Sequence, residues 1–326
     1  MKKFGSMLSM LALIGMISAK TRVIKLAHVV NTKDSFHVAA MKFKEVVEDK
    51  THGRIKIEIH PNAELGDERT LLEGMQMGTI DMGVITDGPI ANFLPEIAVF
   101  EMPFLFASPE EAYAVLDGPV GQKVLKDLDK VRLHGLAFVE RGFRNITNNV
   151  RPIKKASDVK GLKIRVMENP LYVATFKALG ANPVPMAWTE CLTALQQHTI
   201  DGQENPIVVI YAFKLYEVQK YMTLDRHTYA PAVIIMSKKT WDSLSPQDQK
   251  IFEEAARIAR DYVRKWDNDN EAKQLAFIKS KGMIVEEHPD LESFRQAVKP
   301  VYKKYGKKFG KLLDEIQKQL KEMRSK

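Results

Sequence analysis

The sequence has a single cysteine, Cys191, in 326 residues. A lone thiol forms no disulfide within the chain, which excludes a disulfide-stapled scaffold and a cysteine-rich zinc module. Because Cys191 lies in a segment of helical pattern, we expect a packed small side chain there and not a nucleophile. Hydrophobic residues make up 45% of the chain, enough to bury a large core, which excludes a disordered protein. The sequence therefore predicts a globular protein of one large or two medium domains.

Short motifs of several enzyme classes are also missing. The sequence has no P-loop, no GxSxG nucleophile elbow, no GxGxxG after a strand and no HExxH pair. The eight histidines are scattered along the chain, so we expect neither a metal nor a cofactor. Many enzymes lack such motifs, and their absence argues against an enzyme without excluding one.

The net charge of +8 is confined to the two ends of the chain. Residues 299–326 contain nine Lys and one Arg against three acids, and Lys2 and Lys3 add two more positive charges. The long middle part is therefore close to neutral and has no basic groove with interleaved aromatic residues, so we expect no nucleic-acid partner. The basic tail has a helical apolar seam, which predicts a solvated helix and leaves contact with anionic lipid or a partner as a weaker alternative. The seam consists of Leu312, Leu313, Ile316 and Leu320.

The first nineteen residues have the layout of a secretory signal peptide. A positive start, Met1 to Lys3, precedes an apolar stretch over residues 4–17, and Ser18 and Ala19 are small. No later stretch approaches about 18 uninterrupted apolar residues, the minimum for a membrane span. We therefore expect cleavage near residue 19 and a periplasmic protein, with a retained N-terminal anchor as the alternative.

The rest of the chain alternates strands and helices, which predicts the α/β fold class. Residues 22–30 and 54–59 have strand patterns, and residues 35–50 between them carry a helical apolar stripe. The same alternation restarts after Gly161, which indicates two α/β units. Residues 246–279 contain no internal Gly or Pro and predict one long helix that backs both units or passes between them. Because no Gly/Ser linker is present, we expect strands to cross directly from one unit to the other.

Two arginines have settings that favour an anion. Arg165 lies near the end of the apolar strand at residues 162–166, and ligands of open α/β sheets gather at the carboxyl ends of strands. Arg144 lies just before the second unit. The planar guanidinium matches a carboxylate through two parallel hydrogen bonds. The alternative for either arginine is an internal acidic partner, with Glu168 or Glu204 as candidates.

Two further residues belong to the same region. Asn205 offers amide donors and an acceptor for a hydroxyl or carboxylate oxygen, although an Asn before a Pro is also a common turn signal. Trp188 suits the wall of an apolar pocket, and core packing is nearly as good an explanation. Two arginines together with Asn205 favour a bound organic anion over purely internal pairing.

At these residues the sequence resembles the DctP-type substrate-binding proteins of tripartite ATP-independent periplasmic (TRAP) transporters. The likeness runs from about Val23 to the C-terminus, and its motifs are specific in combination. The segments that carry it are Ala63–Asp67, Phe143–Asn148, Lys160–Val166, Leu179–Met186, Ala194–Gln197, Asp201–Pro206, Tyr216–Lys220 and Trp241–Leu244.

The resemblance implies two α/β domains, of the type II periplasmic-binding-protein arrangement, with a ligand cleft between them. Crossing strands and a long helix join the domains, and residues 20–142 with about 231–270 form the first. Residues 143–230 with about 271–326 form the second. The family implies a binding protein without enzymatic activity, which closes over an organic acid and delivers it to TRAP integral membrane subunits. We expect a monomer.

The resemblance also assigns roles to individual residues. Arg165 matches the family's principal carboxylate-binding residue, and Arg144 matches a second arginine that often contacts the ligand. Asn205 matches the Asn of the family's DGQENP stretch, and Trp188 matches an aromatic residue that packs against the ligand. Glu168, three residues after the principal arginine, lies where the rest of the ligand is selected.

The first domain is expected to complete the pocket. Thr86 and Asp87 end a strand that faces the cleft in the family, and His28 stands where some sialic-acid-binding members carry Asn. Acidic Glu168 and Asp87 favour a hydroxylated or sugar-acid-like monocarboxylate, because a second carboxylate would meet repulsion unless Arg144 lay between. Two other functions stay open: an exported enzyme acting on a carboxylate with Glu168 or His227 as base, and a ligand-loaded signalling module.

Overall fold

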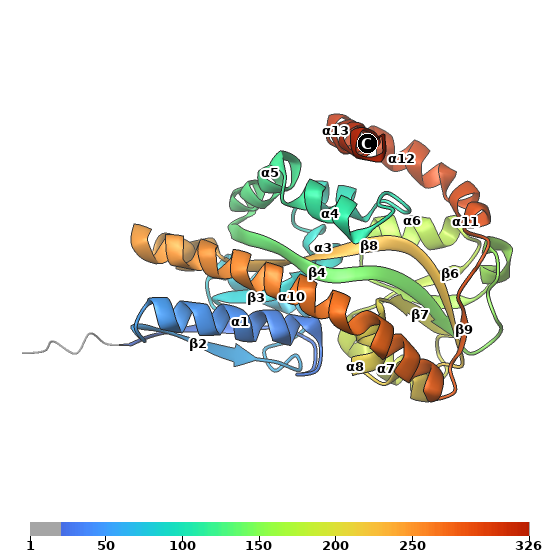
Figure 1. Ribbon diagram of the computed structural model, residues 1–326, viewed down its shortest axis with the longest axis horizontal. Coiled ribbons are helices and arrows are strands. Elements are labelled where there is room, and N and C mark those ends of the chain that lie inside the picture. Colours follow the sequence, from blue (N-terminus) through green and yellow to red (C-terminus); the bar gives the residue numbers. More distant parts are fainter. Residues whose placement is uncertain (1–20, 326) are drawn as a thin grey trace, which may run out of the picture.

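The computed structural model describes residues 21–325, and the predicted signal peptide lies outside them. Nine strands form one mixed sheet in the order β2-β1-β3-β8-β4-β7-β5-β6, with β9 paired to β8 (Figure 1). The α/β class is confirmed. The strands are β1 (Arg22–Ala27), β2 (Ile55–His60), β3 (Met82–Thr86), β4 (Leu133–Asn148), β5 (Lys163–Val166), β6 (Asn182–Pro185), β7 (Gly202–Asn205), β8 (Tyr221–Ser237) and β9 (Ile284–Glu286).

The sheet is divided between two lobes. Parallel strands β1, β2 and β3 belong to the first lobe, and parallel strands β5, β6 and β7 to the second. The long antiparallel strands β4 and β8, of 16 and 17 residues, run through both lobes, as the missing linker led us to expect. Their pairing shifts register between Glu140 and Gly142 and again between Arg144 and Ile146, on either side of the predicted boundary at residue 142.

Helices cover the faces of the sheet. Those of the first lobe are α1 (Ser35–Lys50), α2 (Glu68–Met77), α3 (Asp87–Ile90), α4 (Pro109–Leu116), α5 (Pro119–Asp127) and α9 (Lys238–Asp242). Those of the second are α6 (Pro170–Ala178), α7 (Trp188–Gln196) and α8 (Ile207–Ala212). The helices α10 (Pro246–Ser280), α11 (Leu291–Ala297), α12 (Lys299–Phe309) and α13 (Lys311–Arg324) close the chain. Four 3-10 turns, Pro95–Glu101, Leu128–Val131, Ala156–Val159 and Leu215–Glu217, complete the structure.

Local sequence explains where these elements begin. Asp34 caps α1 by accepting the N–H of Phe36, and Asp67 caps α2 by accepting the N–H of Thr70. Ser245 caps α10 in the same way, with Pro246 at the first helical position, where its missing N–H costs nothing.

The long helix α10 joins the lobes along one side. It has 35 residues, about 50 Å at 1.5 Å per residue, and it packs against α1 of the first lobe, against β4 and against α8 of the second lobe (Figure 1). The expected continuous helix over residues 246–279 is confirmed.

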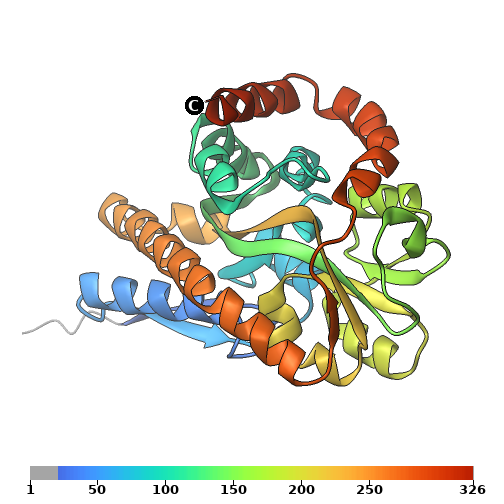
Figure 2. The same ribbon diagram turned by 45° about the vertical axis from the view of Figure 1, so that its right-hand side comes forward.

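The C-terminal helices form a strap, residues 291–325, that arcs from the second lobe back to the first (Figure 2). Tyr305 of α12 donates its hydroxyl to the carbonyl oxygen of Pro170 in the second lobe. From α13, the Gln319 amide donates to the carbonyl oxygen of Ala114 in the first lobe. The sequence prediction placed residues 271–326 wholly in the second domain, and these contacts place α13 on the first lobe instead.

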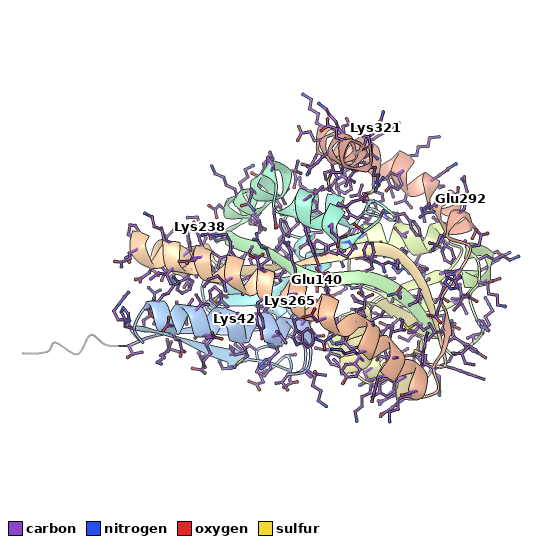
Figure 3. All side chains as sticks on the ribbon, viewed as in Figure 1. Lys42, Glu140, Lys238, Lys265, Glu292 and Lys321 are labelled. Carbon is purple, nitrogen blue, oxygen red and sulfur yellow. The ribbon has the colours of Figure 1, made fainter. Side chains whose placement is uncertain are left out.

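The strap buries its apolar seam and exposes its lysines. Leu313, Ile316 and Leu320 are buried against the first lobe, as the helical pattern predicted. Lys321 projects outward from α13 (Figure 3).

Candidate ligand-binding site

The two lobes touch along one edge of the sheet. The Asn92 amide of the first lobe donates to the carbonyl oxygen of Glu168 in the second at 2.7 Å. A Cβ on Gly88 would lie 2.7 Å from the Met167 Cε across the same boundary, so a larger residue there would force the Met167 side chain to shift. The lobes are therefore in contact, as in a closed bilobed protein.

A buried carboxylate also bridges the lobes. Glu101 of the first lobe accepts hydrogen bonds from the Asn169 amide and the Tyr172 hydroxyl of the second, both at 3.0 Å. Burial raises the pKa of the Glu101 carboxyl to about 8, although the Tyr172 hydroxyl and the charge of Arg144 act in the opposite direction.

Arg165 lies on the second-lobe side of this boundary, in β5. Its Nε and Nη2 donate to the carbonyl oxygen of Met186, at 2.9 and 2.7 Å, and its guanidinium lies 5.7 Å from the ring centroid of Trp188. The side chain is only 3% exposed. Among residues 21–325, no Asp or Glu oxygen lies within 4.0 Å of its nitrogens. Arg165 is thus a buried cation whose hydrogen-bond partner is a neutral carbonyl.

Acidic side chains from both lobes surround a small cavity beside Arg165. Asp67 and Glu68 come from the start of α2 and Glu168 from the second lobe. The cavity volume is about 20 Å³, room for about one water molecule, so an organic acid enters only when the lobes or side chains rearrange. The full lining is Asp67, Glu68, Arg69, Pro89, Arg165, Met167, Glu168, Met186, Ala187 and Trp188.

Sequence reasoning missed Asp67 and Glu68 as site residues. The signal was present, because Asp67 ends the Ala63–Asp67 segment and caps α2. Glu68 accepts the backbone N–H of Thr86 at 2.9 Å, and burial raises the pKa of its carboxyl. This bond ties the predicted residue Thr86 to the cavity wall.

Asp87, the residue after Thr86, is fully buried at the start of α3. Neither carboxylate oxygen has a hydrogen-bond partner among the described residues. Burial, and then the charge of Glu101, raise the pKa of this carboxyl well above its ordinary value. Asp87 adjoins Gly88 at the lobe boundary, and in its protonated form it is a hydrogen-bond donor.

Arg144 has an internal acidic partner. Its Nε pairs with Glu204, and its Nη2 donates to the other carboxylate oxygen of Glu204 at 2.8 Å. The side chain is 1% exposed and its guanidinium lies 5.6 Å from the ring centroid of Tyr172. Burial alone would raise the pKa of Glu204, and the charge of Arg144 lowers it below the ordinary value. The geometry therefore favours the internal-partner alternative over a ligand contact for Arg144.

Asn205 and His28 are also engaged internally. The Asn205 amide donates to the Gln203 side chain at 2.6 Å. His28 is fully buried with its Nε2 3.1 Å from the Nδ1 of His37, and burial followed by the charge of His37 lowers its pKa to about 3. Neither side chain lines the cavity at Arg165, whereas Trp188 and Glu168 do.

His227, the candidate base of the enzymatic alternative, has no free ring nitrogen. Its Nδ1 lies 2.7 Å from Asp225 and its Nε2 3.2 Å from Glu204. Burial favours the neutral ring, but Asp225 and then Glu204 outweigh it and raise the pKa of His227 to about 9. Both ring nitrogens are therefore protonated donors at neutral pH. Cys191 is fully buried, and burial raises the pKa of its thiol to about 11, as expected for a packed side chain.

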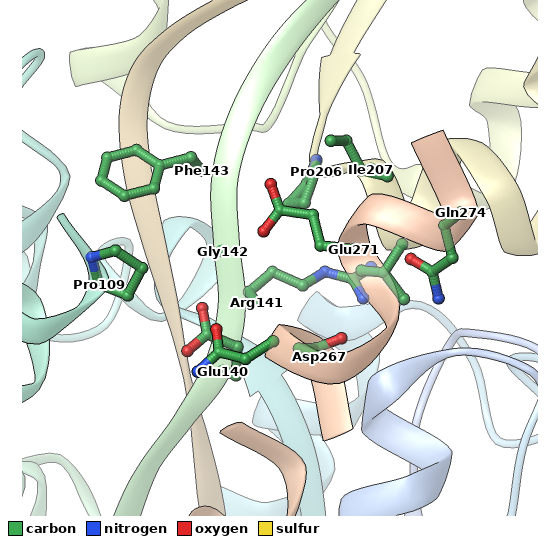
Figure 4. A pocket seen from close by; sticks show the side chains of 12 residues that line it. Pro109, Glu140, Arg141, Gly142, Phe143, Pro206, Ile207, Asp267, Glu271 and Gln274 are labelled. Carbon is green, nitrogen blue, oxygen red and sulfur yellow. The ribbon is translucent and has the colours of Figure 1, made fainter. Parts of the chain in front are cut away.

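A second small cavity lies at the hinge, where β4, α8 and α10 meet (Figure 4). Glu140, Arg141 and Glu271 line it, and Arg141 donates to Asp34 of the first lobe at 2.6 Å. Its volume is about 30 Å³, too small for an organic acid. The Arg141–Asp34 pair ties β4 to the start of α1 at this point.

Two further observations concern the described part of the chain. Its His, Cys, Asp and Glu side chains form no group of three or more placed to hold a metal ion. Between residues 21 and 325 there is also no helix with the length and apolar character needed to cross a membrane.

Two α/β lobes that share long crossing strands and meet at a buried arginine define a bilobed solute-binding protein. The family model of bacterial extracellular solute-binding proteins, family 7 (DctP), matches residues 26–308, and the chain belongs to this family. The predicted resemblance is confirmed. Members of the family are binding proteins that act outside the cytoplasm.

Relatives that align with most of the chain are also named as solute-binding proteins. A solute-binding protein of Verminephrobacter eiseniae is 42% identical, over 86% of this chain and 85% of its own. The 2,3-diketo-L-gulonate-binding periplasmic protein YiaO of Escherichia coli is 35% identical, over 88% of each chain.

Solved structures have the same two-domain fold. A TRAP periplasmic solute-binding protein of Polaromonas, bound to D-erythronate, is 44% identical with a TM-score of 0.89, over 91% of this chain and 98% of that one. The sugar acid binding protein of Advenella mimigardefordensis, in complex with galactonate, is 36% identical with a TM-score of 0.90, over 93% and 99%.

Proposed function

We propose that this protein captures a polyhydroxylated monocarboxylate between its lobes, with Arg165 binding the carboxylate. The observation that carries the proposal is the buried guanidinium of Arg165, which has no acidic partner within 4.0 Å among residues 21–325. Burying an unpaired charge is costly, and a ligand anion removes that cost.

The geometry of Arg165 leaves N–H donors free for a carboxylate. A guanidinium has five N–H donors, and only Nε and Nη2 of Arg165 are used, both on the Met186 carbonyl oxygen. The Nη1 donors and the second Nη2 donor remain for two parallel bonds to a carboxylate. Trp188, above the guanidinium, supplies an apolar wall for the carbon chain.

The charges around the cavity select the rest of the ligand. Asp67, Glu68 and Glu168 line it, and ionised carboxylates repel a second carboxylate but accept hydrogen bonds from hydroxyls. Of the nearby cations that would shield a dicarboxylate, Arg144 is paired with Glu204, and Arg69 is exposed and paired with Glu73. Relatives described with D-erythronate and galactonate support the sugar-acid class.

Membership of the family supports the following biological role. The protein binds its acid in the periplasm after export by the N-terminal signal peptide, closes over it, and delivers it as a monomer to TRAP integral membrane subunits. Binding needs no covalent step in this proposal, and the exclusion of water on closure strengthens the Arg–carboxylate pair.

A ligand panel tests this function. We expect D-erythronate or galactonate to raise the melting temperature and to bind measurably by calorimetry, because a ligand at 100 times its Kd adds about 2.7 kcal/mol to the unfolding free energy. Erythritol, which keeps the hydroxyls without the carboxylate, and succinate, which has two carboxylates without hydroxyls, are the controls. Binding of erythritol as tightly as D-erythronate, or of succinate alone, would contradict the proposal.

The enzymatic alternative is tested with the same samples. Incubation of the protein with the acid that binds, followed by proton NMR, is expected to leave the acid unchanged. Turnover of that acid would establish an enzyme in place of a binding protein.

A further inference from the structure

A cavity of about 320 Å³ lies under the C-terminal strap, away from Arg165. Its walls come from both crossing strands, from the loop before α4, and from helices α11 and α13. Three guanidiniums and three phenyl rings dominate this lining, which consists of Phe104, Phe106, Ala107, Phe143, Asp225, Arg226, Leu291, Arg295 and Arg324. A pocket of this size holds a small organic molecule, unlike the cavity beside Arg165.

Arg226 is the central cation of this strap cavity. Its guanidinium lies 4.2 Å from the ring centroid of Phe143, and no Asp or Glu oxygen among residues 21–325 lies within 4.0 Å of its nitrogens. Its backbone has φ 45°, in the left-handed region that costs a non-glycine residue about 1 kcal/mol or more. The side chain is half-buried, and its charge acts on an acid only at longer range: the Ser108 hydroxyl, and to a lesser degree the charge of Arg226, lower the pKa of Glu110.

Arg295 adds a second weakly compensated charge. Its guanidinium lies 5.7 Å from the ring centroid of Phe104, and its nearest acidic contact is Glu292, at 3.9 Å on the same exposed helix face. A pair of this length between half-exposed side chains contributes little.

The remaining charges of the strap cavity are paired. Arg324 donates through Nε and Nη2 to both carboxylate oxygens of Glu111, each at 2.7 Å. Asp225 accepts the N–H of Ile146 at 3.0 Å and lies 2.7 Å from the Nδ1 of His227. In this cavity, therefore, Arg226 and Arg295 lack a strong acidic partner, whereas Asp225 is already hydrogen-bonded.

We propose that the strap cavity is a second binding site, for a small carboxylate with a flat apolar body, distinct from the sugar-acid site. Arg226 and Arg295 bind its carboxylate, and Phe104 and Phe106 pack against its body. Guanidiniums stacked on rings keep their edge N–H groups free for an oxyanion.

A ligand at this site would contact both crossing strands and the C-terminal strap. Phe143 and Arg226 lie on the two crossing strands, Arg295 on α11 and Arg324 on α13. The N–H of Phe104 also donates to the carbonyl oxygen of His227, at 2.8 Å. A ligand here therefore bridges the hinge and the strap.

Crystals soaked with 4-bromobenzoate test the site directly, because the bromine is located by anomalous scattering. We expect the bromine between the rings of Phe104 and Phe106, with the carboxylate facing Arg226 and Arg295. An anomalous map without a peak in the strap cavity would overturn the proposal.

Calorimetry tests the site in solution. We expect 4-bromobenzoate to bind with a Kd of about 1 mM or tighter, and the double variant Arg226→Gln, Arg295→Gln to weaken it about tenfold. The charge-matched control is Lys250→Gln, Arg257→Gln, two exposed positions of α10. Equal binding by wild type and the Arg226→Gln, Arg295→Gln variant would contradict the proposal, and so would acetate binding as tightly as the aromatic acid.

The Arg165→Ala variant separates this proposal from the sugar-acid function. It is expected to keep its affinity for 4-bromobenzoate while losing D-erythronate, and Arg165→Lys serves if the alanine variant does not fold. Loss of 4-bromobenzoate binding on substitution of Arg165 would place the aromatic acid in the sugar-acid site and overturn the second site.

Discussion

The buried pair of Arg144 and Glu204 makes the sharpest stability prediction. Replacing Arg144 with Met removes a side chain that is 1% exposed and leaves the Glu204 carboxylate without its main partner. Breaking a buried ion pair from one side costs about 3–5 kcal/mol. His227 remains 3.2 Å from Glu204, so we expect the lower end, about 3 kcal/mol. That is a large fraction of the stability of a typical protein, about 5–15 kcal/mol.

Urea unfolding followed by circular dichroism measures this loss. Arg257→Met, at an exposed position of α10, is the matched control and is expected within about 0.5 kcal/mol of wild type. The double variant Arg144→Met, Glu204→Gln is expected to recover part of the stability, because no unpaired charge remains buried. An Arg144→Met protein as stable as wild type that no longer binds the sugar acid would refute the reasoning and return Arg144 to the ligand site.

Three more predictions concern the lobe boundary and the strap. The pKa of Glu101 is about 8 in the folded protein and about 4.5 ordinarily. Between these pH values the folded state keeps a proton that the unfolded state has lost. The stability that this proton contributes is therefore lost as pH rises from about 4.5 to about 8. Glu101→Gln is therefore expected to flatten the fall of the melting temperature between pH 5 and 9, and an unchanged slope would count against this role. Gly88→Val is expected to weaken sugar-acid affinity about tenfold, because the new side chain crowds Met167. Small-angle scattering is expected to show less ligand-induced compaction than in the wild type. Compaction equal to that of the wild type would show that this contact does not limit closure. Arg324→Ala breaks the ion pair between half-exposed Arg324 and Glu111, so we expect a stability loss of about 1 kcal/mol or less. Hydrogen exchange in α13 is expected to become faster. Unaltered exchange would exclude this pair as an anchor of the strap.

Periodicity and capping predicted the fold because these signals are local. The helix at residues 246–280 begins at a Ser–Pro cap signal and has no internal breaker. The strand at residues 55–60 alternates buried Ile55 and Ile57 with exposed Lys56 and Glu58. Arg165 was proposed as a site residue because its strand ends where ligands of α/β sheets gather, and the structure places it at the lobe boundary.

Pairings between distant residues were harder to predict. Arg144 and Glu204 are 60 positions apart and meet only because β4 pairs with β7, so sequence reasoning named Glu204 as a candidate without deciding between it and a ligand. His28 meets His37 where a strand end faces the first turn of α1, a contact with no periodic signal. The position of α13 on the first lobe depends on tertiary contacts such as that of Gln319 with Ala114, because an apolar seam in the sequence does not say which surface it packs against.

Calorimetry with D-erythronate, or with whichever sugar acid of the panel binds, tests the role of Arg165 most directly. Removing one partner of a buried charged pair costs about 2–5 kcal/mol, so Arg165→Ala is expected to lower affinity about 30-fold to several-thousand-fold. Arg165→Lys is expected to weaken binding as well, because a point charge lacks the two parallel donors, and Arg257→Ala is expected to bind as wild type does. Wild-type affinity in a correctly folded Arg165→Ala protein would contradict the central claim.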